Sequence, residues 1–206
     1  MSVSIVVHNS PLFMLQRVLE SLQRATELAV GQGGLEGLVV YCVDNASEPA
    51  YRGSLVKLLN AHTRNERYRL EYLLLEQNRG FGAGHNAALA AARSDYHLIL
   101  NPDAELDAYA LAKGIAAMAD NLDIALLSPA VSGPDGQPEF LCKRYPSVLV
   151  LSLRGFAPVL LRRAFDSRLA RYEMRQELSA GALRCRYRKR LLHAGAHLAA
   201  ARGWRV

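Results

Sequence analysis

Three short polar segments of the sequence hold residues that could bind a phosphate-bearing ligand. Asp44 ends an apolar run, and a carboxylate in that place can accept hydrogen bonds from a ribose hydroxyl or a base N–H. The stretch from Gly80 to Gly84 has three glycines, which let the backbone approach a ligand closely. A helix that begins there would offer free N–H groups, so this segment favours a nucleotide or a phosphate.

The third segment, Asn101-Pro102-Asp103, could hold a divalent cation. A carboxylate beside a diphosphate can bind Mg²⁺ or Mn²⁺, with phosphate oxygens completing the coordination shell. The cation would neutralise the charge that builds on a departing diphosphate. Each segment also has a purely structural interpretation: Asp44 caps the next turn, the glycines form a tight turn, and Asp103 caps a helix.

The elements that must position these segments follow from the periodicity of the chain. Apolar runs alternate with stretches of helical spacing through the first 130 residues, which predicts βαβ units and a mostly parallel sheet. Strands are expected at 3–7, 38–43, 69–75, 96–100 and 124–128, with helices between them and a turn at 133–136. In the first helix, Ser10 is expected as the N-cap and Pro11 as the first helical residue. Ligands bind outside the carboxyl ends of strands in open α/β sheets, so the three segments are expected to form one site.

The net charge of +6 is divided unevenly along the chain. Residues 1–153 carry 12 Lys and Arg against 16 Asp and Glu, and residues 154–206 carry 13 against 3. Such a basic end suits an anionic partner, which could be a membrane surface, a nucleic acid or a diphosphate, and fits a solvated arginine-rich face equally well. Nucleic acid is not favoured as a partner, because basic and aromatic residues are not interleaved beyond Tyr187.

The few cysteines and the absence of a leader or a bilayer-spanning run indicate a cytoplasmic protein. The basic end leaves open a peripheral contact with the inner face of the cell membrane.

Taken in order along the chain, five motifs closely resemble those of bacterial family 2 glycosyltransferases: SIVVHNS, VDNAS, NRGFGAGHNAAL, LILNPDAEL and LLSPAVSGPDG. The nearest subgroup is the rhamnosyltransferase type of cell-surface polysaccharide synthesis, and the resemblance covers residues 2–147. It implies an α/β glycosyltransferase-A fold, the Rossmann-like fold of nucleotide-diphospho-sugar transferases. It further implies a nucleotide diphosphate-sugar donor, inversion at the anomeric carbon, and a saccharide or lipid-linked acceptor.

The resemblance also implies roles for particular residues. Asp44, with Asn45 beside it, would contact the nucleoside of the donor. The glycine loop would lie against the nucleotide through Asn78, Gly80, Gly82 and Asn86. The family's Asp-x-Asp metal motif is matched by Asn101-Pro102-Asp103, which leaves Asp103 as the ligand of Mg²⁺ or Mn²⁺ and Asn101 in the place of the first acid.

The resemblance weakens after residue 147. Family members carry a Ser-Gly-Ala segment, a GGFDE-like stretch and an acidic pair that supplies the general base. Ser179-Ala-Gly-Ala182 echoes the first of these, but residues 183–200 contain no Asp or Glu, so no catalytic base is identified. We therefore expect a donor-binding domain at 1–146 and a basic, mostly helical remnant of the acceptor-side region at 147–206, with the fold incomplete at that end. The alternative is a catalytically impaired remnant that binds a nucleotide-sugar without transferring the sugar.

Overall fold

The structure is a computed structural model that describes residues 1–62, 67–133, 137–139, 165, 167, 184–185 and 197–200. The chain divides into two compact units, Met1–Leu127 with Cys185–Val206, and Ser128–Arg184. Most of the segment predicted as helical, 147–206, lies outside the described residues. Within it, the structure describes two strands, β8 (Arg184–Cys185) and β9 (His197–Ala200).

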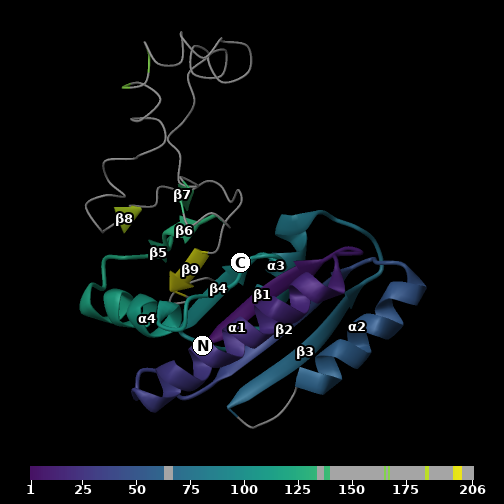
Figure 1. The fold of residues 1–206 in the computed structure, drawn as a ribbon, viewed down its shortest axis with the longest axis horizontal. Coiled ribbons are helices and arrows are strands. Elements are labelled where there is room, and N and C mark those ends of the chain that lie inside the picture. The colour runs from purple at the N-terminus through teal and green to yellow at the C-terminus, as the bar shows by residue number, and fades with distance from the viewer. Residues whose placement is uncertain are drawn as a thin grey trace. The chain divides into compact units, whose positions relative to one another are not determined.

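A mainly parallel sheet forms the centre of the first unit (Figure 1). Its parallel strands lie side by side in the order β3 (Tyr68–Leu75), β2 (Leu38–Asn45), β1 (Ser2–Val7) and β4 (Tyr96–Leu100). Strand β9 pairs antiparallel with β4, and β5 (Leu126–Leu127) pairs antiparallel with β9. The predicted α/β fold with a largely parallel sheet is confirmed, whereas the antiparallel strand β9 was not predicted.

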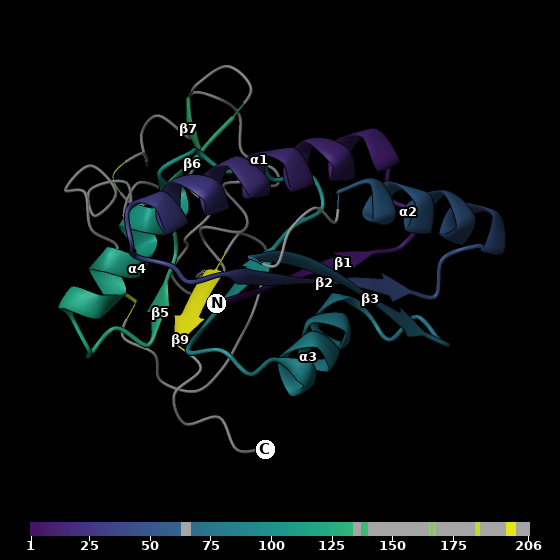
Figure 2. The ribbon, with the colours of Figure 1, turned by 90° about the horizontal axis from the view of Figure 1, so that it is seen from below.

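Helices cover both faces of this sheet. Helices α1 (Leu12–Gly31) and α2 (Pro49–His62) lie on one face, and α3 (Phe81–Ala91) lies on the other (Figure 2). Helix α4 (Ala110–Asp120) packs against α1. The helical spacing of leucines along α1 places Leu15, Leu19 and Leu22 in the core, where each is fully buried.

The start of α1 differs by one residue from the prediction. Pro11 is the N-cap, with φ −56° and ψ 117°, and the helix begins at Leu12. The extended ψ of Pro11 turns its carbonyl toward the helix, where it accepts the N–H groups of Met14 at 3.1 Å and Leu15 at 3.3 Å. The Ser10 hydroxyl instead accepts the N–H of His8 at 3.4 Å and makes no capping bond to the helix.

The second unit contributes one described hairpin. Strands β6 (Val131–Ser132) and β7 (Pro138–Glu139) pair antiparallel, and the Gly133 N–H donates to the Gln137 carbonyl at 2.8 Å. These two strands stand on either side of 133–136, where the sequence predicts a turn. Among the helices that the structure describes, none is long and apolar enough to cross a membrane.

Candidate functional site

The topology brings the three polar segments to the same edge of the sheet. Val7 at the end of β1 pairs with Asp44 of β2, and Ile5 of β1 pairs with Leu100, the last residue of β4. Asn101 therefore follows β4 at the edge where β2 ends. Helix α3 begins at this edge too, because it follows the loop that leaves the carboxyl end of β3.

Two side-chain amides join the end of β2 to the glycine loop. The Asn45 amide nitrogen donates to Asn78 Oδ1 at 2.8 Å, and Asn45 Oδ1 accepts the Arg79 backbone N–H at 3.1 Å. Asn78 Oδ1 also accepts the Gly80 N–H at 2.9 Å. These bonds fix the loop that leads into α3 against the tip of β2.

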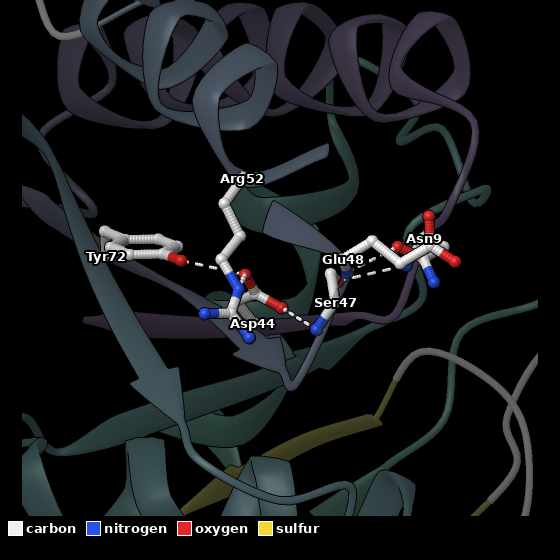
Figure 3. Close-up of polar contacts among 6 residues, drawn as sticks. All are labelled: Asn9, Asp44, Ser47, Glu48, Arg52 and Tyr72. Atoms are coloured by element: carbon white, nitrogen blue, oxygen red, sulfur yellow. Dashed lines mark hydrogen bonds and ion pairs between the residues drawn. The ribbon is translucent and has the colours of Figure 1, made fainter. Parts of the chain in front are cut away.

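A second set of bonds joins the ends of β1 and β2. Asn9, with a left-handed φ of 52°, donates its N–H to Ser47 Oγ at 3.0 Å and accepts the Glu48 N–H at 3.0 Å through Oδ1 (Figure 3). Sequence reasoning did not select Asn9, although it follows the end of a buried strand, β1, as Asn101 follows β4. The strand-end rule that selected the other segments could have found it.

Asp44 lies beneath the surface of this edge, with 0% of the residue exposed. Its Oδ1 accepts the Ser47 N–H at 2.8 Å, so it caps the turn after β2. Its Oδ2 accepts the Tyr72 hydroxyl at 2.8 Å and lies 3.6 Å from Arg52 Nε (Figure 3). Both carboxylate oxygens thus have protein partners, and the Arg52 side chain beside this carboxylate is 33% exposed.

Two tyrosines near Asp44 stay protonated across the physiological range. Burial, and next its hydrogen bond to Asp44, raise the pKa of Tyr72 to about 12. Burial also raises the pKa of Tyr51, to which nearby Cys42 and Asp44 contribute. The Tyr51 hydroxyl is buried and has no hydrogen-bond partner among the described residues. Neither tyrosine was selected from the sequence, because each lies inside an ordinary helix or strand pattern.

The glycines of the loop differ in what requires them. Gly80 adopts φ +83° and ψ 168°, a conformation that side chains rarely tolerate. A Cβ on Gly84 would lie 2.8 Å from both methyl carbons of Val6, so α3 lies directly against β1 there. A Cβ on Gly82 would meet no atom of the described residues within 4 Å. The local fold therefore requires Gly80 and Gly84 but not Gly82.

The N-terminus of α3 is a candidate anion site. No side chain of the described residues caps it, and its first turn holds no acid. The first N–H groups of a helix have no partner within the helix, and they carry the positive end of its dipole. A phosphate at this end would satisfy both features.

The residues after β4 fit a divalent cation. Asn101 Oδ1 is buried and accepts no hydrogen bond from any residue that the structure describes, and Asp103 is exposed nearby in the chain. Mg²⁺ and Mn²⁺ prefer such oxygen ligands. No group of three or more His, Cys, Asp or Glu side chains gathers anywhere in the described part of the chain. A cation at this place would therefore also need oxygen atoms from a bound molecule, such as a phosphate.

The predicted site residues differ in exposure. Asp44 and Asn45 are buried, Gly82 and Asn101 are half-buried, and four residues face solvent: Asn78, Gly80, Asn86 and Asp103. A ligand that binds at this edge of the sheet would contact these four exposed residues first.

Comparisons with known proteins agree with this architecture. The family described as "Glycosyl transferase family 2" matches residues 2–188. No curated protein sequence matches the chain significantly.

Two solved structures resemble the fold. One is S. aureus TarS 1–349, with 22% identity, a TM-score of 0.50, and coverage of 71% of this chain and 38% of that one. The other is the mannosyltransferase PcManGT from Pyrobaculum calidifontis, in complex with GDP-Man and Mn²⁺. Its identity is 20%, its TM-score 0.52, and coverage is 65% of this chain and 36% of that one. The chain thus spans little more than a third of the length of either structure.

Proposed function

The chain belongs to glycosyl transferase family 2 and has a glycosyltransferase-A fold, and from this premise we propose that it transfers a sugar from a nucleoside diphosphate-sugar. The observation that supports this most is the shared edge of β1, β2, β4 and α3. There, two loops are held together by side-chain amides beside an uncapped helix N-terminus.

In this proposal, the diphosphate lies at the N-terminus of α3. The free N–H groups of the first turn would donate to phosphate oxygens, and Gly82 would let the phosphate approach the backbone. Asn78 and Asn86, both exposed, would border the nucleotide. Charge on the departing diphosphate would then be stabilised by donors that are already in place.

Asp103 and Asn101 would hold Mg²⁺ or Mn²⁺ beside the diphosphate. Asn101 Oδ1, buried and without a partner among the described residues, and the exposed Asp103 carboxylate would supply two oxygens, and phosphate oxygens would supply others. When bound, the cation neutralises charge on the leaving group. The mannosyltransferase neighbour was solved with Mn²⁺ and a nucleoside diphosphate-sugar, which supports this assignment.

The nucleoside would contact the end of β2. Asp44 is buried beneath Arg52 in this structure, so direct contact requires the Arg52 side chain to turn outward. The Arg52–Asp44 distance of 3.6 Å is longer than a hydrogen bond, and Arg52 Nε is buried without a hydrogen-bond partner in the described residues. A base carbonyl would give that nitrogen an acceptor while a base N–H donates to Asp44.

For the finer assignments, we propose transfer of rhamnose with inversion to a cell-surface polysaccharide or lipid-linked acceptor. The order of motifs supports the sugar and the inversion. The basic C-terminal sequence supports the lipid-linked acceptor, because it suits an anionic membrane on the cytoplasmic side. A second candidate function is binding of the nucleotide-sugar without transfer. It is favoured by the absence of Asp and Glu from residues 183–200, where the family's general base is expected.

The test is a titration of the chain with UDP, GDP and dTDP, with and without Mn²⁺. We expect one nucleotide to bind, and Mn²⁺ to tighten it. Asp103→Ala should remove the effect of Mn²⁺, whereas Asp120→Ala, a change of an exposed acid at the end of α4, should not. Absence of binding at millimolar concentrations would refute donor binding. Sugar transfer that Asp103→Ala abolishes would exclude the binding-only alternative.

A further inference from the structure

A buried serine of β1 links helix α3 to strand β4. Ser4 Oγ lies 2.6 Å from His85 Nδ1 on α3 and 2.8 Å from His97 Nε2 on β4. All three residues are 0% exposed. One hydroxyl group therefore joins the helix that begins at the glycine loop to the strand that ends at Asn101.

The chain of hydrogen bonds continues along the face of the sheet that α3 covers and ends at a backbone carbonyl. His97 Nδ1 lies 2.7 Å from Ser2 Oγ, which lies 2.7 Å from Ser94 Oγ. Ser94 Oγ in turn donates to the Tyr96 carbonyl at 2.9 Å. That carbonyl can only accept, so it sets the direction of every bond before it.

The first bonds from this end can be assigned in order. Ser94 has one proton and gives it to Tyr96, so the Ser2 hydroxyl must be the donor between Ser2 and Ser94. Ser2 has then used its own proton, so His97 Nδ1 must donate to Ser2 Oγ. Burial lowers the pKa of His97 to about 4, so its ring is neutral at physiological pH and Nε2 carries no proton.

The same reasoning fixes His85. The bare Nε2 of His97 accepts from Ser4, whose single proton is then used, so His85 Nδ1 donates to Ser4 Oγ. Burial, and the nearby His97, lower the pKa of His85 to about 4. His85 is thus a neutral Nδ1–H imidazole, with a buried Nε2 that has no partner among the described residues.

His85 is well placed to control the start of α3. It lies one turn after Phe81, the first residue of the helix, and the two rings meet edge to face with centroids 4.2 Å apart. The preceding residue, Gly84, lies directly against Val6 of β1. The His85–Ser4 bond therefore fixes the turn that follows the free N–H groups.

We propose that His85, as the Nδ1–H tautomer, is a positioning residue that fixes the N-terminal turns of α3 to β1 and β4 and so aligns that helix with a bound diphosphate. The inference rests on the proposed function, because it requires a diphosphate at this helix. Nothing in it requires His85 to touch the ligand.

The test compares His85→Leu with His85→Asn. Leucine fills similar space without a donor, whereas the asparagine amide can place an N–H where Nδ1 lies. Binding of the diphosphate (UDP, GDP or dTDP) and of the matching nucleoside is measured for each chain by calorimetric titration in the presence of Mn²⁺. We expect the Leu variant to bind the diphosphate roughly tenfold more weakly, as for loss of one hydrogen bond to a charged group, and the nucleoside unchanged. The Asn variant should bind both as the unaltered chain does.

The outcomes separate the two proposals. If the unaltered chain binds no diphosphate, the proposed function fails and this inference fails with it. If it binds, but the Leu variant weakens nucleoside and diphosphate equally or neither, the positioning role alone is overturned. Long-range ¹H–¹⁵N spectra of the unaltered chain give a separate readout, which decides the matter even where the Leu variant does not fold. They should show a proton on His85 Nδ1 and none on Nε2, and the opposite tautomer would overturn the inference.

Discussion

Gly82 and Gly84 of α3 make it possible to distinguish a glycine that the fold requires from one that a bound ligand requires. Gly82 has open space where a Cβ would lie, so Gly82→Ala should not clash. Alanine also favours helix over glycine by up to about 1 kcal/mol. We expect the free energy of unfolding of this variant to be unchanged or slightly raised.

Gly84→Ala should behave differently. The new Cβ would lie 2.8 Å from both methyl carbons of Val6, closer than side chains tolerate, so the helix or the strand must shift. Such overpacking costs about 1–3 kcal/mol, and the better helix propensity of alanine offsets up to about 1 kcal/mol of it. The net loss of about 1–2 kcal/mol should disappear when Gly84→Ala is made in a Val6→Ala chain and compared with Val6→Ala alone, because the methyl groups in conflict are gone.

Urea unfolding measures these free energies, and calorimetric titration with the nucleoside diphosphate measures binding. If a phosphate approaches the backbone at Gly82, the added methyl group should weaken binding at least about tenfold, as for loss of a charge-assisted hydrogen bond, with no loss of stability. Full diphosphate binding by Gly82→Ala would refute a close approach there. A Gly84→Ala chain as stable as the unaltered one would refute the packing argument.

Three further predictions concern buried polar groups. Asp44→Asn should lower the free energy of unfolding by about 2 kcal/mol and Tyr72→Phe by about 1 kcal/mol. The first change disturbs every bond of a buried carboxylate, and the second removes only one of them. Urea unfolding measures both, and a larger loss for Tyr72→Phe would contradict this reasoning. The lowered pKa values of His85 and His97, about 4 against 6.5 for a free imidazole, mean that the unfolded chain binds protons which the native chain does not as the pH falls below 6.5. Stability should therefore be independent of these groups above pH 7 and fall by about 2 kcal/mol for each histidine by pH 5, with His85→Asn removing about half of the slope in a pH series of urea unfolding. Asn101→Asp should tighten Mn²⁺ about tenfold, measured by the electron paramagnetic resonance of free Mn²⁺, because it adds a charge at a buried, unpaired oxygen; unchanged Mn²⁺ affinity would argue against a cation there.

Local sequence determined much of the framework. The apolar run 96–100 coincides with β4, and the leucine spacing of α1 identified its buried face. These features depend on residues within a few positions of each other, so periodicity reveals them. The strand-end rule brought Asp44, the glycine loop and Asn101 to one edge, because parallel strands joined by helices all end on the same side.

The short strand β9 shows where local pattern fails. It lies between β4 and β5, although its first residue, His197, stands 97 positions after Leu100, the last residue of β4. Its four residues carry no distinctive alternation, and their place in the sheet follows from pairing alone. Propensity cannot report a partner so distant in sequence.

The sequence by itself determined which residues stand at the ends of the strands and which types of ligand they suit. Only the tertiary structure decided that Tyr72 and Arg52 engage Asp44, and that Ser4 joins His85 to His97. The partners in these contacts come from different strands and helices, and their distances depend on strand register and helix placement. A carboxylate or an imidazole acquires its burial, its protonation and its hydrogen bonds only when those elements pack together.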